Sequence, residues 1–175
     1  MSMQIRLLTA ADAEIYHALR LRALKEHPAA FAQPYESQAS TPIADVVRRL
    51  RETADAPHDF VLGVFLDNAL IGMVGFRRER GERVLHKGSI WGMYIAAEAQ
   101  GQGLGRALML DAIRRAKEMP GLQQIGLGVI SGNADARRLY TSLGFQSCGI
   151  ERRSILVNGE YHDDEYMQLF LGAFE

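Results

Sequence analysis

Cysteine is almost absent from this sequence, and so are several features that mark other classes of protein. The single cysteine, Cys148, excludes an internal disulfide framework and fits a reducing compartment. The 20 basic and 21 acidic residues give a net charge of −1, so the basic excess typical of nucleic-acid-binding surfaces is missing. There is no apolar run long enough to span a bilayer, and the first residues lack the apolar core of a secretory signal. We therefore expect a soluble cytoplasmic protein that binds neither nucleic acid nor membrane.

Repeats and low-complexity segments are also missing, and the composition is that of an ordinary globular protein. Apolar residues make up 47% of the chain and charged residues 23%, which argues against disorder. A length of 175 residues suits one domain with one hydrophobic core. We expect residues 1–175 to form a single domain, and the sequence predicts no metal site.

The stretch from Ile90 to Met119 has the clearest local pattern. It begins as a short apolar run, is interrupted by Gly101, Gly103 and Gly105, and continues with apolar residues at helical spacing. The glycines allow unusual backbone angles and a close approach of a ligand. The first N–H groups of the following helix have no partner within it, and together with the helix dipole they favour a phosphate. A strand, a phosphate-binding turn and a helix are predicted; a plain turn that caps the helix is the alternative.

The spacing of these glycines fits neither of two common nucleotide-binding patterns. Residues 100–106 match neither G-x-G-x-x-G nor the P-loop pattern. Residues 100–105 instead resemble the Q/R-x-x-G-x-G/A signature of the GNAT superfamily of acyl-CoA-dependent N-acyltransferases. The resemblance implies that the loop wraps the pyrophosphate of coenzyme A. The loop residues expected to bind coenzyme A are Gln100, Gly101, Gln102, Gly103, Leu104, Gly105 and Arg106.

A second motif lies downstream. Residues 133–145 resemble the GNAT segment N-x-x-A-x-x-x-Y-x-x-x-G-F at every defining position. Asn133 is a preferred N-cap residue, and Ala136 and Tyr140 lie on one face of the helix that follows. By resemblance these three residues contact coenzyme A; Tyr140 is the general acid for the departing thiolate, and Asn133 bonds the cofactor arm or orders a water. A core aromatic on an amphipathic helix is the alternative for Tyr140.

The rest of the chain alternates between strand and helix patterns. Strands are expected at 4–8, 60–66, 69–77, 86–95, 124–130, 145–157 and 161–171, and helices at 9–26, 41 to about 53, 103–119 and 133–143. This order, β-α-α-β-β-β-α-β-α-β-β, is also that of the GNAT fold. We therefore predict an α/β protein with a twisted mixed sheet of about seven strands flanked by four helices.

The resemblance also implies where the arm of coenzyme A lies. In the GNAT fold the sheet splays between the fourth and fifth strands, here residues 87–95 and 124–130. Pantetheine would lie in that gap, and its amides would pair with the backbone of Met93, Tyr94 and Ile95. Side-chain identity matters little for such contacts.

The segment Ala29–Ser40 reads as a loop that carries aromatic residues. In resembling proteins the region between the first two helices forms one wall of the acceptor site, so Phe31, Tyr35 and Glu36 are candidate substrate contacts. Anchoring of the loop by buried aromatics is the alternative. The arginine run at 48–51 is expected on a solvated helix face, with binding of an anionic partner as the alternative.

The residue that would act as a base is not evident. An amine nucleophile must be neutral, whereas a lysine amine has a pKa of about 10.4 and is protonated at pH 7. Some GNAT proteins carry a glutamate on the fifth strand, five residues before the motif asparagine, but that position is Gly128 here. A base has to come from elsewhere, and His86, Glu36, Glu79 or a water chain are candidates.

The resemblance implies an acetyl-CoA-dependent N-acetyltransferase. It would transfer an acetyl group to a primary amine of a small molecule, amino acid or peptide by direct attack in a ternary complex. The missing carboxylate at Gly128 supports the alternative of a non-catalytic acyl-CoA-binding or sensing module. A nucleotide-phosphate-binding protein that uses the same loop is the third hypothesis. Homodimers are common among resembling proteins, so a homodimer is a further expectation.

Overall fold

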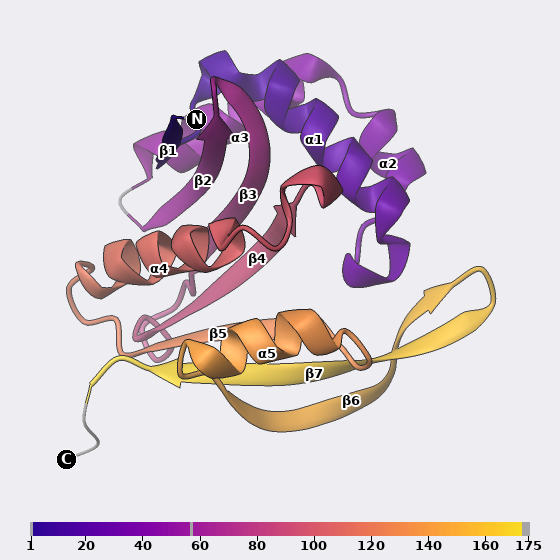
Figure 1. Cartoon of the computed structure of the whole chain (residues 1–175). Helices are drawn as coiled ribbons and strands as arrows, with labels where there is room; N and C mark the ends of the chain where they lie inside the picture. The colour runs from indigo at the N-terminus through magenta and orange to yellow at the C-terminus, as the bar shows by residue number, and fades with distance from the viewer. Residues whose placement is uncertain (1, 57, 173–175) are drawn as a thin grey trace.

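The computed structural model describes residues 2–56 and 58–172, which build one mixed sheet with helices on both faces (Figure 1). The strands are β1 (Met3–Leu7), β2 (Asp59–Leu66), β3 (Ala69–Arg78), β4 (Lys87–Ile95), β5 (Gln124–Ile130), β6 (Gln146–Val157) and β7 (Glu160–Phe170). The α-helices are α1 (Ala13–Glu26), α2 (Tyr35–Ala39), α3 (Ile43–Asp55), α4 (Leu104–Lys117) and α5 (Ala134–Ser142). Three short 3-10 helices in the described residues are η1 (Ala10–Asp12), η2 (Pro28–Ala30) and η3 (Ala97–Ala99).

The sheet runs in the order β1-β2-β3-β4-β5-β7-β6. All neighbouring strands are antiparallel except β4 and β5, which are parallel. These two strands pair only between residues 87–89 and residues 124–126, and they separate beyond that point. Figure 1 shows the two halves of the sheet opening away from each other toward the end of β4. The predicted splay is confirmed, and beyond Ser89 it leaves the β5-facing edge of β4 without a neighbouring strand among the described residues.

Helices cover the two faces of the sheet unequally. The largest core cluster lies between α4, α5 and one face, and includes Leu62, Phe76, Leu108, Ile125 and Phe145. On the other face α1 and α3 pack against smaller clusters of β2, β3 and β4 side chains. β2 is almost wholly apolar because both of its faces are covered. Among the described helices, none combines the length and the apolar composition needed to cross a membrane.

The predicted elements lie within two residues of the observed ones, with two exceptions. The first helix begins at Ala13 rather than at residue 9, because η1 precedes it. The Thr9 N–H donates to Oδ2 of Asp12 at 2.9 Å, and Arg6 holds the same carboxylate at 2.7 and 2.8 Å. The second exception is α2, which lies inside the predicted loop and brings the α-helices among the described residues to five instead of four.

The start of α3 also differs from the prediction. The helix begins at Ile43 instead of residue 41, and Pro42 is its N-cap residue. The Thr41 hydroxyl instead donates to the carbonyl of Ser37 at 3.2 Å, and the Ser40 hydroxyl donates to the same carbonyl at 3.0 Å. Both hydroxyls thus close the end of α2, a helix too short for a periodic pattern to reveal in the sequence.

Candidate active site

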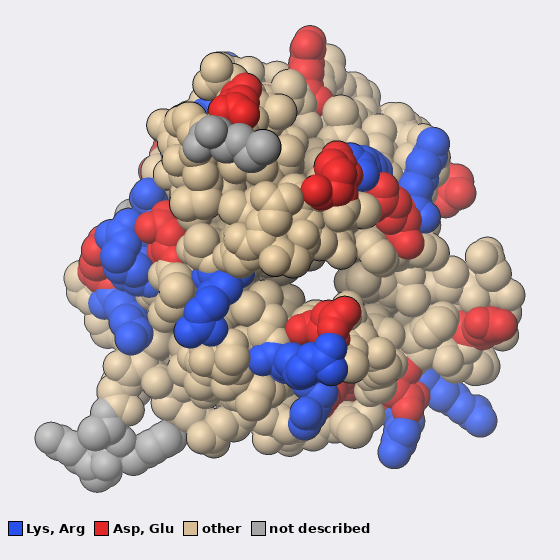
Figure 2. Space-filling model, viewed as in Figure 1, with Lys and Arg blue, Asp and Glu red and all other residues tan. Residues whose placement is uncertain are grey.

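A cavity of about 710 Å³ occupies the gap between β4 and β5. It is lined by residues 90–95 of β4, by residues 127–130 of β5, by the glycine turn and by one side of α5. Figure 2 shows an opening in this face of the molecule between the half that carries α4 and the half that carries α5. The volume is in the range of small-molecule sites.

The cavity brings together most of the residues predicted to bind coenzyme A. These are Met93, Tyr94, Ile95, Gln100, Gly101, Gly103, Leu104, Gly105, Asn133, Ala136 and Tyr140. The Tyr94 hydroxyl donates to Glu26 at 2.6 Å, so this side chain is tied to α1 and its backbone is the part available to a ligand.

Gln102 and Arg106 are not among the residues that line the cavity. The Gln102 amide donates to the carbonyl of Glu98 at 3.4 Å, and Arg106 donates to the Ser142 hydroxyl at 2.8 Å. These side chains therefore have partners within the protein. Contact of Gln102 and Arg106 with a phosphate stays a prediction that concerns their backbone N–H groups.

The glycine turn presents open backbone at the start of α4. Gly101 and Gly103 have φ values of 74° and 77°, in the left-handed region that favours glycine. Apart from the adjacent residues, no atom of the described residues lies within 4 Å of where a Cβ atom of either would be. Gly103 is the N-cap of α4, and no side chain among the described residues caps it. The free N–H groups of the first turn therefore fit an anionic group such as a diphosphate.

β4 is irregular where it borders the cavity. Its pairing with β3 shifts register, since Met73 pairs with Tyr94 but Gly75 pairs with Trp91. Gly92, between them, has a φ of 64°. Such a bulge turns backbone N–H and C=O groups of β4 away from their pairing with β3. The bulge thus offers backbone polar groups beside the edge of β4 that has no neighbouring strand.

Asn133 and Tyr140 take the places that the second motif predicts. The Asn133 carboxamide oxygen accepts from the Ala136 N–H at 3.2 Å, which confirms Asn133 as the N-cap of α5. Tyr140 is buried, its ring lies 6.0 Å from that of Phe145, and it also lines the cavity. Burial raises the pKa of Tyr140 to about 12. The phenol therefore stays protonated throughout the physiological pH range.

None of the side chains proposed from the sequence as a base lines this cavity: His86, Glu36 and Glu79 all lie elsewhere. Asp164 of β7 does line it. A Cβ atom at Gly128 would lie 2.5 Å from Oδ2 of Asp164 and 3.1 Å from Oδ1. The carboxylate of Asp164 therefore occupies the space into which a side chain at residue 128 would project.

Asp164 is also electrostatically distinct from its neighbour Asp163. Burial, and then the charge of Glu151, raise the pKa of Asp164. No described residue donates a hydrogen bond to it, whereas Asp163 pairs with Arg152 at 2.6 Å and accepts from the Arg153 N–H. Sequence reasoning missed Asp164 because it lies far from both motifs. The signal was present as two adjacent aspartates on a strand, which must face opposite sides of the sheet.

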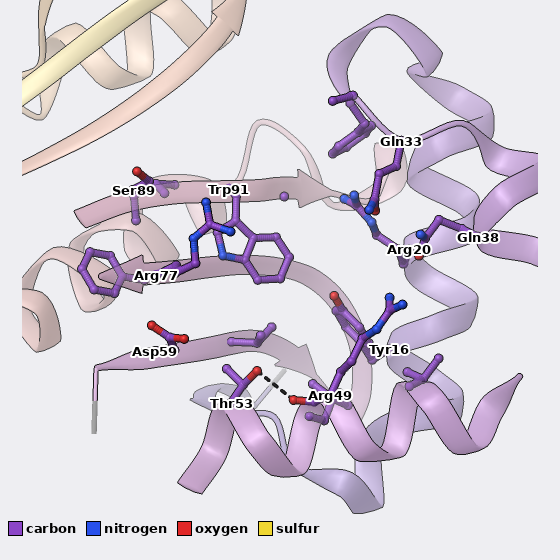
Figure 3. A pocket seen from close by; sticks show the side chains of 18 of the residues that line it. Tyr16, Arg20, Gln33, Gln38, Arg49, Thr53, Asp59, Arg77, Ser89 and Trp91 are labelled. Carbon is purple, nitrogen blue, oxygen red and sulfur yellow. Dashed lines mark hydrogen bonds between the residues drawn. The ribbon is translucent and has the colours of Figure 1, made fainter. Parts of the chain in front are cut away.

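A second cavity, of about 680 Å³, adjoins the first (Figure 3). It lies among α1, α3 and the strands β2 to β4, and it shares Phe31, Trp91, Gly92 and Gly128 with the first cavity. The Trp91 indole packs on Gly75, where it leaves no room for a Cβ atom. The two cavities therefore meet at the β4 bulge, which is where a donor and an acceptor could react.

The predicted substrate contacts are only partly brought to these cavities. Phe31 lines both. Within the described residues, Tyr35 and Glu36 of α2 line neither, and the Tyr35 ring instead lies 4.6 Å from the Lys25 ammonium. Arg49 of the arginine run, expected on a solvated face, lines the second cavity. No group of three or more His, Cys, Asp or Glu side chains in the described residues is placed to hold a metal ion.

The model of the Acetyltransferase (GNAT) family matches residues 21–145 of this chain. The chain belongs to this family. It is 31% identical over 166 residues to the mycothiol acetyltransferase of Acidothermus cellulolyticus. This match covers 86% of the chain and 47% of that protein. The chain thus spans about half the length of that relative.

Solved structures share the fold. A GNAT acetyltransferase from Streptococcus pneumoniae superimposes with a TM-score of 0.88 at 23% identity, over 97% of this chain and 99% of that chain. YncA, a putative acetyltransferase from Salmonella typhimurium solved with its cofactor acetyl-CoA, superimposes with a TM-score of 0.85 at 24% identity, over 100% and 97% of the two chains. The predicted GNAT fold is confirmed.

Proposed function

We propose that this chain transfers the acetyl group of acetyl-CoA to a primary amine of a small molecule, amino acid or peptide, by direct attack in a ternary complex. The observation that carries the proposal is the meeting of two cavities at the β4 bulge, one beside the glycine turn and one beside α1. Family membership and the acetyl-CoA bound by the YncA structure support the choice of donor.

The residues around the first cavity suit acetyl-CoA, which supplies a thioester as the acyl donor. The turn at Gly101 and Gly103 would hold the diphosphate, and the open edge of β4 would pair with the pantetheine amides. A helix N-terminus contributes roughly 0.3–1 kcal/mol, whereas micromolar binding needs about 8 kcal/mol. Most of the affinity must therefore come from the strand-like contacts and the apolar walls of the cavity.

Asp164 is proposed as the general base. Its carboxylate accepts a proton from the amine nitrogen as the new C–N bond forms, and a raised pKa makes it a stronger base than an ordinary aspartate. Asp164 occupies the space of a side chain at Gly128. The lack of a carboxylate at Gly128 of β5 therefore no longer favours a non-catalytic sensing module, because Asp164 of β7 supplies a carboxylate in the same space.

Tyr140 is proposed to act on the departing sulfur. Full proton transfer from a phenol of pKa about 12 to a thiolate of ordinary pKa, about 8.5, is uphill by about 5 kcal/mol. The phenol therefore keeps its proton and donates a hydrogen bond to the sulfur, which stabilises the negative charge that develops as the C–S bond breaks and coenzyme A leaves as the thiolate. Asn133 would help to hold the arm of coenzyme A near this point.

The test is a thiol-release assay with acetyl-CoA and a broad panel of amines at several pH values, combined with calorimetric titration of acetyl-CoA. We expect saturable binding of acetyl-CoA and release of coenzyme A with at least one amine. Binding without turnover on any amine would instead identify a sensing module. Tighter binding of ATP or NAD than of coenzyme A would identify a nucleotide-binding protein.

A further inference from the structure

Arg20 of α1 is buried and forms no ion pair with another described residue. Its side chain lines the second cavity and is only 8% exposed, and its Nη1 atom has no hydrogen-bond partner among the described residues. Burial lowers the pKa of its guanidinium. An unpaired buried charge destabilises a fold, so such a group is usually paired or bound to a ligand. Arg20 thus lowers the free energy of unfolding. Because its side chain lines a cavity, an anionic ligand bound there can raise that free energy again.

Among the described residues, no carboxylate acts on the charge of Arg20. The Cζ atom of Arg20 lies 4.6 Å from the centre of the Phe31 ring. The ring covers one face of the guanidinium, but it accepts none of the hydrogen bonds that the guanidinium donates in its own plane. Figure 3 shows Gln33 and Gln38 beside it, both of which are neutral. Neither the ring nor these two amides neutralises the guanidinium, so its charge is left for an anion that enters the cavity.

Other charges on the cavity wall favour an anion as well. Arg49 and Arg77 also line it, and neither forms an ion pair with the residues that the structure describes. The two carboxylates on the wall are already engaged, since Asp59 lies 3.2 Å from Arg80 and Glu52 lies 3.9 Å from Arg48. The cavity thus holds more unpaired positive charge than negative charge, which attracts anionic ligands.

The position of Arg20 determines the distance between an anion bound to its guanidinium and the β4 bulge, where the proposed reaction takes place. The Nη1 atom would lie 3.4 Å from a Cβ atom at Gly92, in the bulge where the two cavities meet. The proposed thioester lies against the same bulge. An anion held by Arg20 is therefore adjacent to the attacking nitrogen, and only a short linkage can join the two.

We propose that the acceptor is a free α-amino acid, whose carboxylate binds Arg20 while its amine faces the thioester. This inference rests on the proposed function and names its substrate class. A planar guanidinium matches a carboxylate through two parallel hydrogen bonds. In an α-amino acid one carbon joins the amine to the carboxylate. The N-terminus of a peptide and the side chain of lysine have no carboxylate at that position.

The test compares each of the common L-amino acids with its α-carboxamide, its decarboxylated amine and a dipeptide that begins with it, using wild type, Arg20→Met, Arg20→Lys and Arg51→Met. Arg51 is an exposed arginine of α3 outside the cavity and serves as the control. We expect wild type and the control to use the best amino acid about 100-fold more efficiently than its amide. Arg20→Met should abolish that preference by slowing the acid alone, and Arg20→Lys should keep part of it.

A binding measurement separates this inference from the proposed function. N-acetyl-amino acids and their amides are titrated by calorimetry into each variant saturated with coenzyme A. Binding of an N-acetyl-amino acid that is lost in Arg20→Met supports the carboxylate site, even where no amine is acetylated and the proposed function fails. Equal binding of acids and amides, binding of neither, or an unchanged preference in Arg20→Met overturns the inference, even where amines are acetylated.

Discussion

The carboxylate of Asp164 fills the space that a side chain at Gly128 would take, with 2.5 Å between Oδ2 and the position of a Cβ atom. The two residues lie on neighbouring antiparallel strands, where Gly128 pairs with Tyr166 and Ile130 pairs with Asp164. A diagonal contact of this kind requires one partner to be small. The glycine on β5 is therefore what admits a carboxylate from β7.

The first prediction concerns Asp164 as a base. Asp164→Asn should lower kcat about 100-fold, because an amide cannot accept the amine proton, and it should leave the Kd for acetyl-CoA nearly unchanged. Asp163→Asn is the matched control, since Asp163 is the adjacent aspartate and pairs with Arg152 instead of lining the cavity. Steady-state rates and calorimetry measure the two quantities. Equal losses in both variants would assign Asp164 a structural role.

The pH profile provides an independent measurement. Because burial raises the pKa of Asp164, the rate should fall with decreasing pH at a higher pH than an ordinary aspartate would give. In Asp164→Asn this acidic limb should disappear, while in Asp163→Asn it should stay. The profile of kcat at saturating acetyl-CoA and amine measures it, because kcat reports the groups of the complex and not the free amine. A limb that survives unchanged in Asp164→Asn would contradict the assignment.

The second prediction tests the shared space directly. Gly128→Ala should reduce kcat by roughly tenfold, because its methyl group forces the carboxylate of Asp164 to move. The exchange Gly128→Glu with Asp164→Gly moves the carboxylate to β5 and should restore part of the activity that Asp164→Gly alone removes. Rates of the three variants decide the matter. Unchanged activity in Gly128→Ala would separate Asp164 from the chemistry.

The parts of the site that the sequence predicts are local, and the parts that it misses are not. The glycine turn and Asn133 with Tyr140 sit in continuous segments, where spacing alone sets the geometry. Asp164 reaches the cavity through the register between β5 and β7, and Arg20 reaches it through the packing of α1 on β3. Neither register nor helix orientation can be read from one segment.

The fold itself was predictable because most elements are long and periodic. β5 has the predicted bounds, and α4 and α5 lie within two residues of theirs. The prediction is wrong at α2, a helix of five residues, because one turn carries no period and is held by its surroundings. Its Gln38 is buried and lines the second cavity, so the prediction also missed part of the wall of that cavity.

The third prediction concerns Tyr140. Tyr140→Phe removes the only group on α5 proposed to donate to the sulfur, and it should lower kcat roughly tenfold to 100-fold with little change in the Kd for acetyl-CoA. The ring stays packed against Phe145, so the melting temperature should hardly move. Rates, calorimetry and thermal unfolding measure these effects. An unchanged rate would leave Tyr140 as a core aromatic residue.

The fourth prediction concerns the glycine turn. Gly103→Glu should weaken acetyl-CoA binding at least 100-fold, because it places a side chain and a like charge where the diphosphate would bind. Gly159→Glu is the matched control: its φ of 83° resembles the 77° of Gly103, its Cβ position is equally open, and it lies in the β6–β7 hairpin. The control should suffer the same backbone strain and keep its affinity. Equal affinity in both variants, measured by calorimetry, would place the diphosphate elsewhere.

The last prediction is that Asp164 destabilises the fold at neutral pH. An aspartate whose pKa is raised on folding binds more protons in the folded state, so the free energy of unfolding falls as pH rises from the ordinary value through the raised one. Above that window the full penalty applies, and Asp164→Asn should raise the melting temperature by roughly 1–3 °C. Below an ordinary aspartate pKa, about 3.9, the two proteins should melt alike. Thermal unfolding of both proteins at pH 8 and at pH 3.5 measures this. An equal gain in melting temperature at both pH values would attribute it to packing. A gain at pH 8 alone would mean that the buried carboxylate charge of Asp164, which the proposed reaction uses as a base, also destabilises the fold.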